Sequence, residues 1–283
     1  MGFFDIIKMI LIAACAGVTE WLPVSNSAHI TVLGHYLGFP DWNASAVFRE
    51  QYVGAATFGA LMAAVLLFLP KNLPLYRDWK GNVKAAGERT RIFTVIGLSW
   101  IPNLVIGLIF GSDFSAFTYA PDSLRTLRMT MVLMIAGGLI VWFAEIRNRA
   151  TLPLYDRPED VPFRFWLLIG LVQTVAFLPG CSRFGIAILL AVTLGIGRRT
   201  AVTVAILSGM PSLIVNGLLP LVIHGIQPDR WMISELITAA IVSFLVSFAV
   251  VRAIVSYLSE TSLTRFAKYR IAFGILLYLF CIL

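Results

Sequence analysis

Two short polar motifs interrupt apolar parts of this chain. The first, TEWLPVSNSAH at residues 19–29, places a carboxylate, hydroxyls, an amide and an imidazole close together. The second, PGCSRFG at residues 179–185, sets a permanent cation and a hydroxyl between glycines. Ionisable residues at membrane depth are costly, roughly 2.5 to 3.5 kcal/mol on insertion scales, so they indicate function by default. We therefore predict a buried site that contains Glu20 and Arg183.

An anion is the ligand that the second motif suits best. The planar guanidinium of Arg183 matches phosphate oxygens, and the flanking glycines let backbone N–H groups approach a ligand closely. A helix that restarts after Gly185 would add N–H donors and a favourable dipole. Together these features predict binding of a phosphate group.

A purely structural role is the alternative for the same residues. Glu20 and His29 would then only pair with Arg183 and hold two segments of the chain together. For Arg183 by itself, the structural alternatives are a snorkelling side chain or a paired one. Gln173 either lines the cavity or makes a satisfied hydrogen bond between helices.

The composition describes a chain whose solvent is the bilayer. Of the 283 residues, 59% are hydrophobic and 13% are charged, and the mean hydropathy of +0.86 excludes an ordinary water-soluble domain. Six apolar runs approach the roughly 20 residues that a membrane-spanning helix needs. They cover residues 53–69, 92–110, 129–144, 201–223, 236–258 and 271–283. We predict an all-α integral membrane protein with about six transmembrane helices.

The distribution of charge predicts the topology. The net charge is +7, but the basic residues lie in short segments between apolar runs, which is typical of cytoplasmic loops and argues against nucleic-acid binding. Segments 71–91, 147–164, 198–199 and 265–270 are basic and should be cytoplasmic, whereas segments 112–123 and 224–231 should face outside. Both termini are then outside.

Two further apolar stretches, residues 3–37 and 163–194, are interrupted and must each begin and end on one side. Each is therefore predicted to be a re-entrant helical hairpin, the first entered from outside and the second from inside. Their tips align as LPVSNS at 22–27 and LPGCSR at 178–183. We interpret this as an inverted-topology repeat, about 1–146 and 160–283, within a single membrane domain spanning 1–283.

The motifs resemble those of the bacterial undecaprenyl-diphosphate phosphatases of the bacitracin-resistance type. In that family the first motif is similar to E-G-x-T-E-F-x-P-V-S-S-T-G-H and the second to P-G-x-S-R-S-G-x-T. The counterparts here are AGVTEWLPVSNSAH at 16–29 and PGCSRFGIA at 179–187. The likeness continues through TFGAL at 57–61, MP at 210–211 and YRIAFG at 269–274, and so runs along the whole chain.

The resemblance implies an enzyme that removes the terminal phosphate of a polyprenyl diphosphate at the outer side of the bacterial cytoplasmic membrane. Such an enzyme recycles the lipid carrier for peptidoglycan synthesis. Glu20 would be the essential carboxylate, His29 a general acid or base, and Arg183 the clamp on the diphosphate. The phosphate-binding candidates are Ser25, Asn26, Ser27, Gly180, Ser182 and Arg183.

Cofactors and partners also follow from the resemblance alone. It implies a divalent cation such as Mg or Ca, for which Glu20 is the candidate ligand and no metal is identified by the sequence. The expected partners are a polyprenyl diphosphate or another phosphorylated lipid and the membrane lipids, with a homodimer left open.

Four positions depart from the family pattern. Ala16 replaces the first of two acidic residues, Asn26 replaces a serine proposed to take part in the chemistry, and Phe184 and Ala187 replace hydroxyls near the phosphates. The site is therefore poorer in polar groups than the family pattern. This leaves an alternative function on the same fold, a non-hydrolytic transporter (flippase) of a polyprenyl phosphate or a related lipid phosphate.

Overall fold

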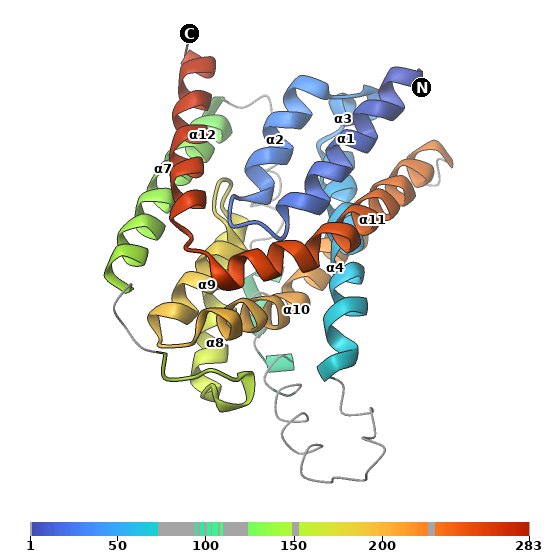
Figure 1. Ribbon diagram of the computed structural model, residues 1–283. Helices are drawn as coiled ribbons and strands as arrows, with labels where there is room; N and C mark the ends of the chain where they lie inside the picture. Colours follow the sequence, from blue (N-terminus) through green and yellow to red (C-terminus); the bar gives the residue numbers. More distant parts are fainter. Residues whose placement is uncertain are drawn as a thin grey trace.

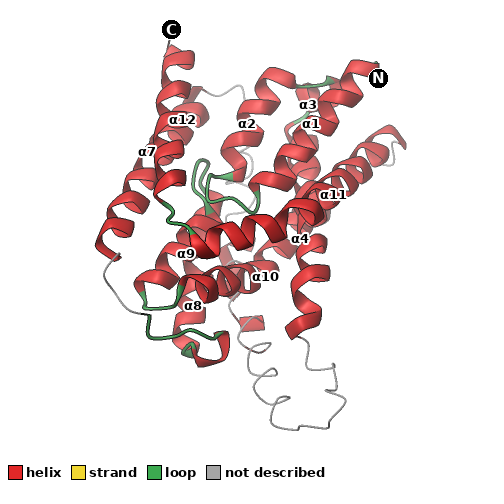
Figure 2. Ribbon diagram, viewed as in Figure 1, coloured by secondary structure: helices red, strands yellow, loops and turns green. Residues whose placement is uncertain are grey.

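The computed structural model describes residues 2–72, 124–148, 153–225 and 230–282, with a few isolated positions between 94 and 109. Over these residues the chain is helical and forms no strand beyond a single isolated bridge, between Tyr155 and Ile196 (Figure 2). Much of the predicted span 92–110 lies outside the described residues. So do nearly all of the basic segment 71–91, the segment 112–123, and residues 226–229 of the predicted outer segment.

Figure 1 shows the order of the helices. They are α1 (Phe3–Thr19), α2 (Asn26–Leu37), α3 (Pro40–Ala44), α4 (Ala46–Asn72), α7 (Leu124–Arg147), η2 (Pro158–Asp160), α8 (Phe163–Val172), η3 (Gln173–Phe177), α9 (Arg183–Thr193), α10 (Arg198–His224), α11 (Arg230–Glu260) and α12 (Thr264–Ile282). Among the described residues four segments are long and apolar enough to cross a membrane: Ala46–Phe68, Thr126–Arg147, Arg198–His224 and Trp231–Glu260. The chain is therefore an all-helical integral membrane protein.

These four segments contain four of the six predicted spans, those at 53–69, 129–144, 201–223 and 236–258. The predicted span at 271–283 falls in α12, which is helical up to Ile282 but is not among the four. The total number of spans stays a prediction.

Two helical hairpins approach each other from opposite ends of the molecule (Figure 1). Helices α1 and α2 form the first, and α8, η3 and α9 form the second. The N- and C-termini lie at the same end of the molecule, as expected if both are on one side of a membrane. Re-entrance into a membrane and the inverted repeat stay predictions.

The turn of each hairpin is set by its local sequence. After α1, Pro23 cannot continue a helix, and Ser25 adopts φ +77°, a left-handed conformation that is rare outside glycine. In the second hairpin Pro179 precedes Gly180, whose φ is +90°. A Cβ added to Gly180 would lie 2.6 Å from the Thr130 carbonyl oxygen, so this close approach to α7 requires glycine.

Helix α4 packs against both α10 and α11, while α7 packs along α12 and α1 along α11. Small residues permit close contacts between these backbones. A Cβ added to Gly59 of α4 would lie 2.1 Å from the Ala240 carbonyl oxygen of α11. On α12, one added to Gly274 would lie 3.0 Å from the Met131 carbonyl oxygen of α7.

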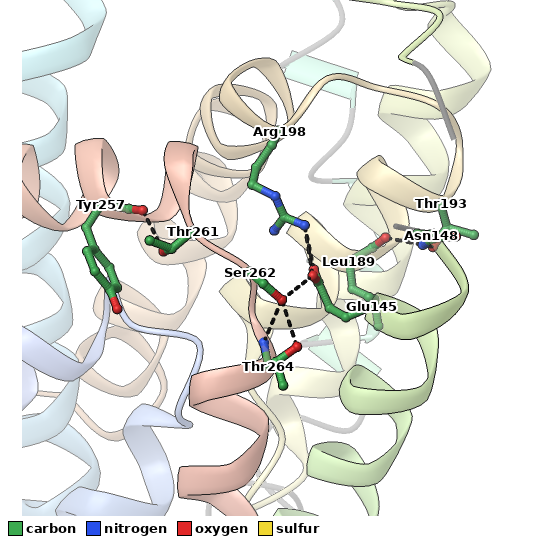
Figure 3. Close-up of polar contacts among 9 residues, drawn as sticks. All are labelled: Glu145, Asn148, Leu189, Thr193, Arg198, Tyr257, Thr261, Ser262 and Thr264. Carbon is green, nitrogen blue, oxygen red and sulfur yellow. Dashed lines mark hydrogen bonds and ion pairs between the residues drawn. The ribbon is translucent and has the colours of Figure 1, made fainter. Parts of the chain in front are cut away.

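A partly buried ion pair joins the ends of several helices away from the hairpin tips (Figure 3). One terminal nitrogen of Arg198, at the start of α10, donates to both oxygens of Glu145, at the end of α7, at 2.8 and 2.9 Å. The Ser262 hydroxyl donates to the same carboxylate at 2.7 Å and accepts from the Thr264 N–H at the start of α12. The pair therefore fixes three helix ends relative to one another.

Candidate functional site

The two hairpin tips meet through a buried ion pair. Arg183, the first residue of α9, donates to Glu20 Oε1 at 2.8 Å, and both side chains are less than one-tenth exposed. Phe184 contacts Trp21 edge to face with ring centroids 6.3 Å apart. The sequence prediction that Glu20 and Arg183 lie together is therefore consistent with the structure.

Arg183 is held in place by a second partner. Its other terminal nitrogen donates to Gln173 Oε1 at 2.9 Å, and Gln173 donates to the Ser208 hydroxyl at 2.8 Å. Ser208 in turn donates to the Val204 carbonyl at 2.7 Å. Of the two alternatives for Gln173, the satisfied hydrogen bond is the one observed. Its amide fixes the direction of the guanidinium.

Asn26 occupies the other oxygen of the Glu20 carboxylate. Its amide nitrogen donates to Glu20 Oε2 at 2.5 Å, and its amide oxygen lies 2.8 Å from the Thr19 hydroxyl. Each oxygen of Glu20 therefore accepts a hydrogen bond, one from Arg183 and the other from Asn26. Asn26, which departs from the family pattern, thus contacts directly the carboxylate of Glu20, which matches that pattern.

Two helices begin at this meeting point. Ser25 caps α2 by accepting from the Ala28 N–H at 3.4 Å, and Ser182 caps α9 by accepting from the Gly185 N–H at 3.2 Å. The expectation that the second helix restarts after Gly185 is wrong, because Pro179 and Gly180 break the chain earlier and α9 starts at Arg183. The first N–H groups of a helix have no intrahelical partner, and its N-terminus is the positive end of the helix dipole.

The remaining phosphate-binding candidates lie beside these caps. The hydroxyl oxygens of Ser25 and Ser27 are 3.3 Å apart, and the Gly180 N–H points at the Ser27 hydroxyl at 3.5 Å. The structure therefore brings the candidates of both motifs together across the two tips.

His29 lies next to this network but not on Arg183. Its Nδ1 is 2.7 Å from the Ser25 carbonyl oxygen, and its Nε2 is 2.6 Å from the Tyr269 hydroxyl. The structural alternative, in which both Glu20 and His29 pair with Arg183, is therefore right for Glu20 and wrong for His29. The reason is that α12 supplies the partner of His29.

Three of the departures from the family pattern are buried. Phe184 and Ala187 belong to the main apolar core, where Phe184 packs on Trp21 instead of offering a hydroxyl. Ala16 is 3% exposed and lies one helical turn before Glu20, whose N–H donates to the Ala16 carbonyl at 3.1 Å. A carboxylate at position 16 would therefore lie on the same side of α1 as Glu20.

The described residues do not form a site that fits a divalent cation by themselves. They contain no group of three or more His, Cys, Asp or Glu side chains arranged to hold a metal ion. Glu20 is the only carboxylate of the first motif, and both of its oxygens already accept hydrogen bonds. The cation implied by the family resemblance stays a prediction.

The sequence groups Arg270 with the basic residues Arg265 and Lys268, but its environment differs from theirs. Arg270 is 3% exposed inside α12, whereas Arg265 and Lys268 are exposed. The cytoplasmic side of this segment stays a prediction. The Arg270 guanidinium donates to the Gly180 carbonyl at 3.0 Å. The available signal was its position in YRIAFG, directly before an apolar run. Tyr269 is also absent from the predicted site.

Comparison with known proteins places the chain in a family. The family model described as "Bacitracin resistance protein BacA" matches residues 9–276. The undecaprenyl-diphosphatase of Streptococcus mutans is 29% identical over 280 residues, which cover 98% of this chain and 96% of that protein. Undecaprenyl-diphosphatase 1 of Chromobacterium violaceum is 30% identical over 260 residues, covering 92% and 90% respectively. The chain belongs to the family of the bacitracin resistance protein BacA.

Proposed function

We propose that this protein is a membrane phosphatase that hydrolyses a polyprenyl diphosphate, with undecaprenyl diphosphate as the substrate, to the monophosphate. The observation that carries the proposal is the convergence of the N-termini of α2 and α9 beside the buried Arg183. Two positive dipole ends and a guanidinium attract an anion from two directions. The names of the matched relatives supply the substrate class.

Binding of the diphosphate requires an exchange of partners at Arg183. The guanidinium now donates to Glu20 through one nitrogen and to Gln173 through the other. A phosphate oxygen that replaces Glu20 keeps the charge of Arg183 compensated, while Gln173 continues to direct the guanidinium. The Glu20 carboxylate is then released beside the phosphorus.

The released carboxylate orients the nucleophile. An amide at position 26 cannot attack phosphorus, so we assign the attack to a water molecule. The water oxygen bonds to the terminal phosphorus as the bond to the bridging oxygen breaks, and the proton of the water passes to Glu20. Asn26 holds Glu20 through its second oxygen during this step, and His29 serves as a general acid or base next to it.

Position in the cell follows from the same proposal. We place the protein in the bacterial cytoplasmic membrane with both termini outside, which is supported by their location at one end of the molecule (Figure 1). The two hairpins then enter from opposite faces as halves of an inverted repeat. A homodimer and a divalent cation stay predictions. No comparison favours the transporter alternative.

The test is phosphate release from undecaprenyl diphosphate by purified protein in proteoliposomes. The wild type should release phosphate, and Glu20→Gln should lower the rate by about 10³-fold because it removes the proton acceptor. Glu145→Gln is the matched control, since Glu145 also pairs with an arginine but lies at the other ion pair. It should release phosphate at a rate close to that of the wild type.

A different pair of results would contradict the proposal that the protein is a phosphatase. The wild type would release no phosphate with or without Mg²⁺ or Ca²⁺, while a labelled polyprenyl monophosphate changed leaflet in a manner that depended on Arg183. That pair of results would establish the transporter in its place.

A further inference from the structure

Helix α12 presents three side chains, Tyr269, Arg270 and Phe273, to the two hairpin tips, and we name this set the α12 clamp. The rings of Tyr269 and Phe273 lie nearly parallel to that of His29, at interplanar angles of 10° and 14°. The centroid of Phe273 is only 4.7 Å from that of His29. The two aromatic residues are one helical turn apart, so one face of α12 fixes the plane of the imidazole.

The hydrogen bonds of His29 fix its tautomer as well. A backbone carbonyl can only accept, so the 2.7 Å contact with the Ser25 oxygen requires the proton of the neutral ring to be on Nδ1. Nε2 then carries a lone pair and accepts from the Tyr269 hydroxyl at 2.6 Å. Nε2 is therefore the nitrogen that can exchange protons, and Tyr269 controls it.

Arg270 acts on the other tip. It donates to the Gly180 carbonyl at 3.0 Å and to the Leu133 carbonyl of α7 at 3.3 Å. The side chain is 3% exposed, and its Nε has no hydrogen-bond partner. Gly137 makes room for it, because an added Cβ there would lie 2.2 Å from a terminal nitrogen of Arg270. The buried guanidinium of Arg270 thus holds the Gly180 turn, which carries residues predicted to bind phosphate.

We propose that the α12 clamp is a positioning element of the phosphatase site: Tyr269 and Phe273 hold the ring and tautomer of His29, and Arg270 holds the Gly180 turn. This inference rests on the proposed function and deepens it. None of the three needs to touch the substrate, because they act through His29 and through the backbone of the second tip. Three residues of α12 would thereby fix the positions of the two hairpin tips relative to each other.

Tyr269→Phe tests the first arm of the clamp. It removes one hydroxyl and keeps the stacked ring, so the protein should fold. We expect kcat for phosphate release to fall by about tenfold with KM within about twofold, a part of the 10²- to 10⁴-fold that acid–base groups contribute. Tyr278→Phe is the matched control, because Tyr278 is an exposed tyrosine of the same helix.

A second measurement separates this arm from the proposed function. In protein with ¹⁵N-labelled histidine, the resonance of the unprotonated Nε2 of His29 should shift in Tyr269→Phe and stay in place in Tyr278→Phe. If the wild type releases no phosphate, the proposed function fails while this shift still reports on the clamp. An unchanged resonance in Tyr269→Phe would overturn the positioning role of Tyr269.

Arg270→Gln and Arg270→Lys test the second arm. The glutamine variant loses the charge and one donor, and we expect KM for the diphosphate to rise by about tenfold because the Gly180 turn loosens. Lysine keeps a cation that can reach one carbonyl and should return KM to within about threefold of the wild type. Arg265→Gln, on the same helix but exposed, is the control.

The two variants distinguish positioning from packing. If Arg270→Gln does not fold, Arg270→Lys carries the test, with an expected rise in KM of about twofold to threefold. If the variants lower the melting temperature but leave kcat and KM unchanged, Arg270 is a packing residue only and this arm of the proposal is wrong.

Discussion

Two carboxylate–guanidinium pairs in the described part of the chain differ in construction. In the pair at the hairpin tips, one nitrogen of Arg183 contacts one oxygen of Glu20, and the remaining groups go to Gln173 and Asn26. In the pair at the helix ends, Arg198 contacts both oxygens of Glu145, and Ser262 adds a third donor (Figure 3). The first pair connects two turns, whereas the second connects ends of long helices.

Because of this difference, we expect the Arg183–Glu20 pair to exchange partners at a lower free-energy cost than the Arg198–Glu145 pair. A carboxylate that accepts three hydrogen bonds, two from the start of α10 and one from an inter-helix turn, is part of the framework, and breaking such a pair leaves a buried charge without compensation. Under the proposed function, Arg183 accepts a phosphate in place of Glu20 while Gln173 keeps the orientation of the guanidinium. The same chemical pair would then serve binding at one place and stability at the other.

The largest contrast is expected from Arg183→Lys and Arg198→Lys. Lysine cannot donate to Glu20 or phosphate and to Gln173 in the same planar geometry, so Arg183→Lys should lower kcat/KM by about 10²-fold, or about 2.7 kcal/mol. Arg198→Lys retains one contact with Glu145 and should change kcat/KM by less than about threefold. Phosphate release over a range of substrate concentrations measures both.

Equal losses in the two lysine variants would remove the distinction between the pairs. So would a larger loss in Arg198→Lys than in Arg183→Lys, since it would place the second pair in the reaction.

The next contrast concerns stability. Glu145→Gln leaves Arg198 without a carboxylate and weakens the contact with Ser262, which should cost about 1 to 3 kcal/mol of unfolding free energy. The expected result is a lower melting temperature in detergent with a normal rate of phosphate release per folded molecule. Ser259→Ala, in which the lost hydroxyl bonds only a carbonyl of its own helix, is a control that should leave the melting temperature nearly unchanged. An unchanged melting temperature in Glu145→Gln would show that the second pair is dispensable.

Much of the helical architecture follows from the sequence, because hydropathy and helix-breaking residues are local signals. Runs such as 53–69, which is uncharged, and 236–258, whose one charged residue is Arg252, are long and apolar, and each lies inside a long helix. Pro23 and Pro179 mark the hairpin turns directly. The packing of α4 between α10 and α11 is not encoded in any local pattern, since it depends on which small residues meet across helices.

The site was only partly predictable for the same reason. Glu20 and Arg183 stand out as charges within apolar sequence, so their pairing could be inferred. Arg270 is harder to recognise, because it follows Arg265 and Lys268 and only its position in YRIAFG distinguishes it from a loop residue. Its burial depends on Gly137 of α7, which leaves space for the Arg270 side chain. A space that one helix provides for a side chain of another gives no periodic pattern in the sequence.

A smaller contrast is expected at two glycines with positive φ. Gly180 (φ +90°) lies at the hairpin tip, and Gly195 (φ +83°) lies in the turn that leads to Arg198. Alanine at either position should cost about 1 to 2 kcal/mol of stability. At Gly180 the added Cβ also meets the rigid Thr130 carbonyl at 2.6 Å, so the turn must move and phosphate release should fall by at least about fivefold.

At Gly195 the added Cβ meets the flexible end of Leu154 at 3.1 Å, and activity should persist. Thermal unfolding and phosphate release on both variants give the comparison. A Gly180→Ala protein with full activity would mean that the second tip does not have to be held rigidly.

The smallest effect is expected from adding a carboxylate to the first pair. Ala16 lies one turn before Glu20 on α1, so Ala16→Glu would place two carboxylates together where the structure now has one. Two adjacent carboxylates bind a divalent cation better than a single one. Ca²⁺ at ten times its dissociation constant should then stabilise the variant by about 1.4 kcal/mol, while the wild type should respond less.

Ala16→Gln is the control for size without charge. If Ca²⁺ stabilises the wild type as strongly as Ala16→Glu, then Glu20 releases Asn26 or Arg183 to bind the ion, and the pair at the tips exchanges partners with cations as well as with phosphate.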